Sequence, residues 1–148
     1  MRRRYAVVPG DGIGVEVTRV AVRVMHAAVV DTEVVLEIVT FPFGAEHYLE
    51  TGESLPPGMF DRFRGFDGIL MGAFGDPRVP DMRHARDILL GTRFELDLYA
   101  NIRPVRCPLE SLNPLKGHRA EDIDFVVFRE NTEGAYVGMH GFAHKGQS

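Results

Sequence analysis

The first half of the chain alternates between short apolar runs and longer segments with apolar residues at helical spacing. The short runs predict strands, and the spaced segments predict amphipathic helices. The strands are expected at 5–9, 34–40 and 69–71, and the helices at 15–30, 43–50 and 57–64. Strands that alternate with helices in this order are typical of an α/β fold with a parallel sheet.

The pattern is less regular after residue 74. The elements expected there are a polar loop (75–81), a helix (82–92), an extended segment (97–104), a Pro- and Gly-containing loop (108–120) and two strands (125–128 and 135–138). In the helix, Ile88 and Leu89 are expected to face the interior, together with Met82 or Ala85. The chain contains no internal repeat and no low-complexity segment.

Composition narrows the class of protein. A length of 148 residues corresponds to one average domain. The net charge of −4 gives no electrostatic support for binding nucleic acid or a membrane surface. No apolar run approaches the roughly 18 residues of a membrane helix, and the N-terminus does not resemble a signal peptide. The single cysteine, Cys107, excludes an intrachain disulfide and a thiolate metal cluster, so a cytoplasmic protein is expected.

Two glycine-containing turns follow predicted strands. Gly10, Gly12 and Gly14 have the spacing G-x-G-x-G, which differs by one residue from the dinucleotide-binding G-x-G-x-x-G. Thr40, and no acidic residue, ends the second strand, so a simple tight turn is favoured over a phosphate site. The segment 72–77 follows the third strand and fits a ligand-binding loop or a purely structural loop equally well. Both turns are expected at the carboxyl edge of the sheet, where ligands of parallel sheets bind.

Three arginines and one tyrosine are the residues best suited to chemistry: Arg93, Arg103, Arg129 and Tyr136. Guanidinium groups bind carboxylates through two parallel hydrogen bonds, and tyrosine can transfer a proton. Together they predict a site for a small polyanion. The alternative is that the arginines are solvated surface residues and the tyrosine packs in the interior. The six histidines have no metal-ligand spacing, and none is favoured as a catalytic residue.

At these residues the sequence resembles the metal-dependent β-decarboxylating dehydrogenases, a family that includes isopropylmalate, isocitrate, homoisocitrate, tartrate and D-malate dehydrogenases. The resemblance rests on four stretches in the family's order: Val8–Val17, Gly72–Pro77, Arg93–Pro104 and Asp124–Gly138. It is closest to the 3-isopropylmalate dehydrogenases. It implies their α/β fold, with residues 1–103 forming the first half of the large domain and residues 104–148 beginning the second domain.

The resemblance also implies the roles of individual residues. Arg93, Arg103 and Arg129 match the arginines that bind the substrate carboxylates, and Tyr136 matches the tyrosine that protonates the product carbon. Ile13, Gly72, Gly75 and Asp76 are expected near the nicotinamide end of NAD. A divalent metal, Mg²⁺ or Mn²⁺, is implied with ligands outside this chain. The full-length protein is expected to be a homodimer that acts on a small hydroxy-dicarboxylate.

The helix before Arg93 is where the family selects its substrate. Leu89 and Leu90 match the leucine pair that packs the isopropyl group of isopropylmalate, and Asp87 would repel the third carboxylate of isocitrate. The segments 131–134 and 76–80 are similar to those of tartrate and D-malate enzymes. We therefore rank isopropylmalate first, tartrate or D-malate second and isocitrate third.

Family members are roughly twice the length of this chain or more. The lysine that takes the hydroxyl proton, the aspartates that bind the metal and the adenosine pocket are expected beyond Ser148. The chain alone is therefore expected not to turn over substrate. An alternative from a different class is a non-enzymatic role, in which a truncated or split relative serves as a binding subunit.

Overall fold

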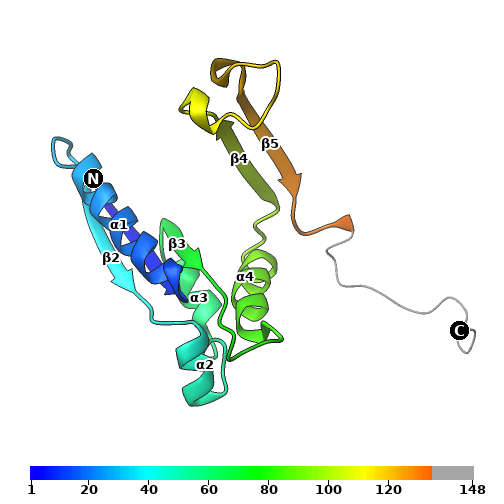
Figure 1. Cartoon of the computed structure of the whole chain (residues 1–148). Helices are drawn as coiled ribbons and strands as arrows, with labels where there is room; N and C mark the ends of the chain where they lie inside the picture. Colours follow the sequence, from blue (N-terminus) through cyan, green and yellow to red (C-terminus); the bar gives the residue numbers. More distant parts are fainter. Residues whose placement is uncertain (135–148) are drawn as a thin grey trace, which may run out of the picture. The chain divides into compact units, whose positions relative to one another are not determined.

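The computed structural model describes residues 1–134. It divides into two compact units, Met1–Leu96 and the residues from Asp97 onward, and each unit is described by itself. The elements of the first unit are β1 (Arg2–Gly10), α1 (Ile13–Ala28), β2 (Val35–Thr40), α2 (Ala45–Thr51), α3 (Met59–Arg64), β3 (Gly68–Ala73) and α4 (Arg83–Glu95) (Figure 1). The predicted alternation of strands and helices is therefore confirmed, with boundaries that differ by a few residues.

The first unit contains a three-stranded parallel sheet with the strand order β2-β1-β3. Tyr5 of β1 pairs with Ile38 of β2 on one side and with Gly68 of β3 on the other. The predicted parallel sheet is thus confirmed. Because all three strands run in the same direction, the residues that follow Gly10, Thr40 and Ala73 lie at one edge of the sheet.

The main core lies on one face of the sheet. Ala6 and Val8 point to this face and pack with Phe41, Phe63 and Ile88, all of which are buried. The Phe41 and Phe63 rings meet edge to face, with centroids 5.6 Å apart. This geometry is favoured by aromatic quadrupoles and adds to the burial of apolar area. The core therefore connects β1, the segment after β2, α3 and α4.

Helix α1 contacts β1 and β3. Gly14 and Thr18 are its buried residues, and their small side chains allow the helix backbone to approach the strands closely. Val17, Val20 and Val24, which gave the segment its helical periodicity, remain about half exposed. The apolar spacing therefore predicted the helix correctly but did not identify the residues that contact the sheet.

The second unit contains an antiparallel two-stranded ribbon formed by β4 (Ala100–Arg106) and β5 (Asp124–Glu130). The connection between them contains two short 3-10 helices, Glu110–Leu112 and Ala120–Asp122. The apolar run predicted as a strand lies in β5, but Phe125 and Phe128 are exposed in the described residues. The strand predicted over 135–138 lies outside the described residues. None of the helices in residues 1–134 has the length and apolar character needed to span a membrane.

Candidate functional site

The glycines at the carboxyl edge of the sheet permit close backbone packing. A side chain at Gly14 would come within 2.5 Å of the carbonyl oxygens of Pro9 and Ala73. A side chain at Gly72 would overlap the Pro9 carbonyl oxygen and come within 2.6 Å of the Thr18 hydroxyl. Gly10 has a φ of +73°, which favours glycine. These residues thus let β1, β3 and the first turns of α1 meet, which accounts for the glycine spacing without a phosphate.

A buried carboxylate joins the three loops at this edge. Asp11 is 8% exposed and directly follows β1. Its Oδ1 accepts a hydrogen bond from the backbone N–H of Ala45 at 2.6 Å, and its Oδ2 accepts one from the N–H of Gly75 at 2.9 Å. Ala45 begins α2, and Gly75 lies in the loop after β3. A single side chain therefore satisfies backbone donors from the other two strand-to-helix connections.

His84, in the first turn of α4, is the fourth member of this group. Its side chain is fully buried, and Nε2 lies 2.8 Å from Asp11 Oδ2. An ionised carboxylate only accepts hydrogen bonds, so Nε2 carries the hydrogen and donates it. The ring stacks on Tyr48 with centroids 6.0 Å apart. We refer to Asp11, Ala45, Gly75 and His84 as the Asp11 cluster. Sequence patterns did not favour this histidine, because its partner lies 73 positions away.

The residues expected near the nicotinamide lie at the same edge of the sheet. Ile13 begins α1 and is 62% exposed, and Gly75 is tied to the loop after β1 through Asp11. Gly72 lies within β3 against α1. The structure thus brings the two glycine-containing turns together, as the parallel sheet predicted.

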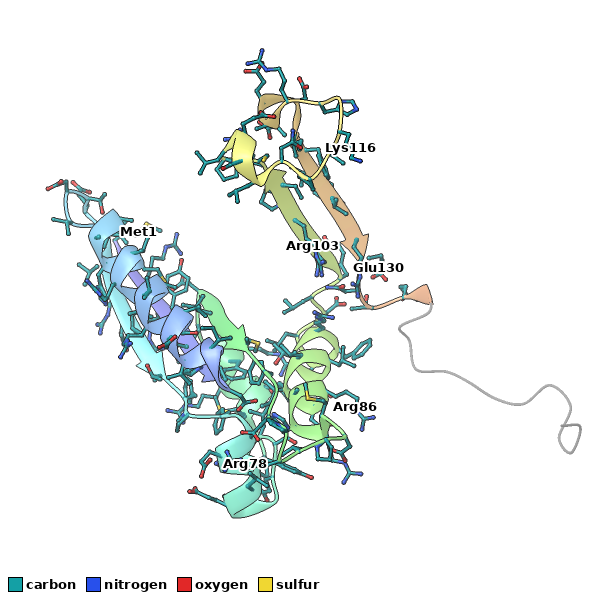
Figure 2. All side chains as sticks on the ribbon, viewed as in Figure 1. Met1, Arg78, Arg86, Arg103, Lys116 and Glu130 are labelled. Carbon is teal, nitrogen blue, oxygen red and sulfur yellow. The ribbon has the colours of Figure 1, made fainter. Side chains whose placement is uncertain are left out.

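Asp76 is engaged within its own loop. Both of its carboxylate oxygens accept hydrogen bonds from the guanidinium of Arg78, at 3.0 Å and 2.9 Å. Arg78 also pairs with Glu46 of α2 at 2.7 Å, and Figure 2 shows it beside that helix. The hydrogen bonds from Arg78 lower the pKa of Asp76 to about 2. Asp76 is therefore a permanently ionised part of the loop at neutral pH.

Helix α4 presents three of the predicted substrate residues on one surface. Leu89 and Leu90 precede Arg93 by four and three positions, so their side chains lie beside its base. All three are partly buried, and Arg93 lies in the last turn of the helix. Asp87 is exposed and accepts a hydrogen bond from the Ser54 hydroxyl at 2.9 Å. An apolar pair next to a fixed cation suits a ligand with one alkyl group and one carboxylate.

The β4–β5 ribbon presents the other two arginines. Asn101 pairs with Arg129 across the ribbon, and Arg103 lies two residues further along β4. Side chains two residues apart on a strand share a face, so Arg103 and Arg129 are diagonal neighbours on one face. Asn101 accepts a hydrogen bond from the Nε of Arg103 at 2.8 Å, which orients the guanidinium. Figure 2 shows Arg103 on β4 and Glu130 at the end of β5.

The turn after β5 is organised by Glu130. Its carboxylate accepts hydrogen bonds from the backbone N–H of Thr132 and of Glu133, and the Thr132 bond is the main cause of its lowered pKa. Asn131 is buried, and its N–H donates to the Tyr99 carbonyl at 2.9 Å. The turn therefore connects the ends of β4 and β5 immediately after Arg129.

The predicted site residues do not all lie within one described unit. Arg93 belongs to the first unit, whereas Arg103 and Arg129 belong to the second. Tyr136 lies outside the described residues. Within residues 1–134 no three His, Cys, Asp or Glu side chains are grouped as a metal site.

Comparisons with known proteins point to one family. A family model described as isocitrate/isopropylmalate dehydrogenase matches residues 4–147. The 3-isopropylmalate dehydrogenase of Thermobifida fusca is 43% identical over 143 residues, which are 97% of this chain and 40% of that protein. The corresponding enzyme of Nocardia farcinica is 46% identical over 138 residues, which are 93% of this chain and 39% of that protein. The chain thus spans about 40% of the length of these curated relatives.

Solved structures agree with the sequence comparisons. The isocitrate dehydrogenase of Methylococcus capsulatus matches with a TM-score of 0.69 and 28% identity, over 93% of this chain and 37% of that one. The β-decarboxylating dehydrogenase of Thermococcus kodakarensis, in its apo form, matches with a TM-score of 0.61 and 34% identity, over 89% of this chain and 35% of that one. The predicted isopropylmalate dehydrogenase-like α/β fold is therefore confirmed.

Proposed function

The chain belongs to the isocitrate/isopropylmalate dehydrogenase family, and we propose that it supplies part of the active site of an NAD-dependent enzyme. The proposed reaction is the oxidative decarboxylation of a 2-hydroxy dicarboxylate, with 3-isopropylmalate as the substrate and 2-oxoisocaproate as the product. This is a step of leucine biosynthesis. The observation that carries the proposal is the pair Arg103 and Arg129 on one face of the β4–β5 ribbon.

These arginines bind the malate backbone of the substrate. Each guanidinium offers paired N–H donors to one carboxylate, and both remain charged at any working pH. Arg93 completes the set from the last turn of α4, and Leu89 and Leu90 pack the isopropyl group beside it. Tyr136 supplies a proton to the carbon that loses carbon dioxide. For the whole enzyme we propose that residues 1–103 belong to the large domain and that residues 104–148 begin the second domain.

The carboxyl edge of the sheet suits the nicotinamide end of NAD. Ile13 provides an exposed apolar surface for a flat ring, and the space around Gly12 is open. Gly75 and Asp76 border this edge, with the loop backbone already restrained by Asp11. When bound, NAD accepts the hydride released from the hydroxyl-bearing carbon of the substrate. The chain's own contribution is to orient the ring and to exclude water from that side.

The divalent metal that the family uses does not fit the residues described here. Residues 1–134 contain no grouping of three acidic, histidine or cysteine side chains that could bind Mg²⁺ or Mn²⁺. The metal ligands are expected outside them, in a whole enzyme that we propose to be a cytoplasmic homodimer.

A second candidate substrate is tartrate or D-malate. The segments 131–134 and 76–80 favour it, because they are similar to those of enzymes for these substrates. The partly buried pair Leu89 and Leu90 favours isopropylmalate, since a hydroxyl group would gain no hydrogen bond there. The binding free energies of related alkyl groups in an apolar pocket differ by only about 1–3 kcal/mol. The two candidate substrates therefore require a direct comparison.

The test is a titration of the ¹⁵N-labelled chain, followed by NMR. Separate titrations use NAD, 3-isopropylmalate, tartrate, D-malate and isocitrate, with acetate as the control for unspecific carboxylate binding. We expect 3-isopropylmalate to shift signals of α4 and the ribbon, NAD to shift signals around Ile13 and Gly75, and acetate to shift neither. A sample that contains the chain, NAD, 3-isopropylmalate and Mg²⁺ together should produce no NADH, because residues 1–134 contain no grouping that could bind the metal. Binding of none of the four hydroxy acids would contradict the proposal and favour a non-enzymatic binding subunit.

A further inference from the structure

The Asp11 cluster lies at the proposed cofactor edge, but none of its contacts is needed by the proposed chemistry. Asp11 and His84 are both buried and polar, and burial of such groups is costly unless their hydrogen bonds are satisfied. Here three donors converge on one carboxylate at distances of 2.6, 2.8 and 2.9 Å. A buried group with this many partners restrains every segment that it contacts.

We propose that His84 and Asp11 are positioning residues that fix the three strand-to-helix loops in the arrangement that binds the cofactor before any ligand arrives. The inference rests on the proposed function, because the loops matter only if NAD binds at this edge. His84 acts through Asp11, because its own side chain is fully buried. Its role is to hold the carboxylate where Ala45 and Gly75 can donate to it.

The geometry explains why the histidine is needed in addition to the two backbone donors. Oδ1 is engaged by Ala45, while Oδ2 is shared between Gly75 and His84. A side chain at Gly44 would come within 2.5 Å of Oδ1, so the absence of a side chain at this position leaves room for the carboxylate. Without the Nε2 donor, Oδ2 would depend on Gly75 alone, in the loop that carries Asp76. The carboxylate could then rotate away, and the loop would lose its connection to β1.

The orientation of the imidazole is itself determined. The other ring nitrogen, Nδ1, is buried and has no hydrogen-bond partner within residues 1–134. Stacking on Tyr48 keeps the ring plane in place. One function of this ring is therefore to donate from Nε2, and a glutamine could donate from a similar distance along the side chain. A phenylalanine has a similar shape but no donor.

These differences define a test with two readouts in the chain itself. The variants are His84→Phe, His84→Gln and, as a matched control, Thr92→Val. Thr92 is buried on the same helix, but its hydroxyl bonds only to the Ile88 carbonyl of that helix. The first readout is hydrogen exchange at the Ala45 and Gly75 amides, with the Phe41 amide, which follows β2 and donates to the Val7 carbonyl of β1, as an internal reference. The second is the dissociation constant for NAD from NMR titration.

We expect His84→Phe to speed exchange at Ala45 and Gly75 about tenfold or more, while Phe41 changes little, because only local opening becomes easier. NAD affinity should fall by about tenfold, since the binding arrangement is then populated only part of the time. His84→Gln should restore both values to within about threefold of the native chain, because the donor is retained. Thr92→Val should leave both readouts near native.

The outcomes separate the two proposals. Unchanged exchange and unchanged NAD affinity in His84→Phe would overturn the positioning role. Faster exchange at Phe41 to the same extent would also overturn it, because the histidine would then support the whole unit and not the loops. If the native chain binds no NAD while His84→Phe still loosens only Ala45 and Gly75, the proposed cofactor site fails and the restraint on the loops stands as a structural feature.

Discussion

Replacement of Arg103 by glutamine tests the ribbon as a carboxylate site. The side chain of Asn101 accepts a hydrogen bond from the Nε of Arg103 at 2.8 Å. The two Nη groups of Arg103 are therefore available to bind one carboxylate in parallel. A hydrogen bond to a charged group contributes about 1.5–3 kcal/mol when it is well formed. Arg103 is exposed, so solvent screening favours the lower end of that range. Since about 1.4 kcal/mol corresponds to a factor of ten, we expect roughly tenfold weaker binding of 3-isopropylmalate.

The assay is the dissociation constant of 3-isopropylmalate, measured by NMR titration of the chain. Arg106→Gln is the matched control, because Arg106 lies on the same strand three residues away and therefore points to the opposite face. Its Nη2 pairs with Asp124 at 2.8 Å, which is the main cause of its raised pKa. Both variants remove one positive charge from the same strand. They differ in the face of the ribbon that loses the charge, and Arg106→Gln also removes the ion pair with Asp124.

Three results would refute the argument. Equal weakening by Arg103→Gln and Arg106→Gln would show that the dicarboxylate responds to net charge alone. No weakening by Arg103→Gln would exclude this guanidinium from the site. The third test adds Arg129→Gln. If both arginines bind one ligand, the two effects should be non-additive, because neighbouring groups that share a ligand are coupled. Strict additivity in the double variant would mean two independent carboxylate sites.

Three further predictions concern the fold around the site. Phe63→Ala should lower the free energy of unfolding, measured in urea, by about 3–5 kcal/mol, because Phe63 is 1% exposed. Phe128→Ala is the control and should change this free energy much less, because Phe128 is 73% exposed. Arg78→Gln should raise the carboxyl pKa of Asp76 from about 2 toward 3.8 in an NMR pH titration. Because the folded pKa is the lower one, the stabilisation from this pair is present above pH 3.8 and lost as the pH falls toward 2. Gly72→Ala should lower the melting temperature, since its methyl group would overlap a carbonyl oxygen of β1; an unchanged value would contradict the packing argument.

The order of elements could be predicted because each strand and helix has its own local pattern. Short apolar runs gave β1, β2 and β3, and their alternation with helices gave the parallel sheet. The same order placed the two glycine-containing turns at one edge, where Gly75 and Asp11 are now seen in contact. Patterns were less informative about burial. The valines of α1 have helical spacing and are still about half exposed, because Gly14 and Thr18 make the close contact with the strands.

In the candidate site, too, residues could be predicted from the pattern of their sequence neighbours but not from partners that are distant along the chain. Arg103 and Arg129 could be singled out because each lies in or at the end of a strand-like run, and antiparallel pairing then brings them to one face. Their roles came from resemblance, since spacing alone leaves a surface arginine equally acceptable. His84 could not be found in this way. Its neighbours in sequence are ordinary helix residues, and its partner Asp11 is distant along the chain.

The glycines and Asp11 together explain how the loops at this edge of the sheet are held close together. Gly14 and Gly72 bring α1 and β3 so close to β1 that no side chain fits between them. The loops that leave the three strands are consequently crowded at one point, and their backbone donors must find acceptors away from water. Asp11 provides that acceptor for Ala45 and Gly75 at once. Close packing by glycine thus creates the need for a buried carboxylate. The carboxylate in turn makes the loop positions depend on one another, because its two oxygens accept hydrogen bonds from both loops.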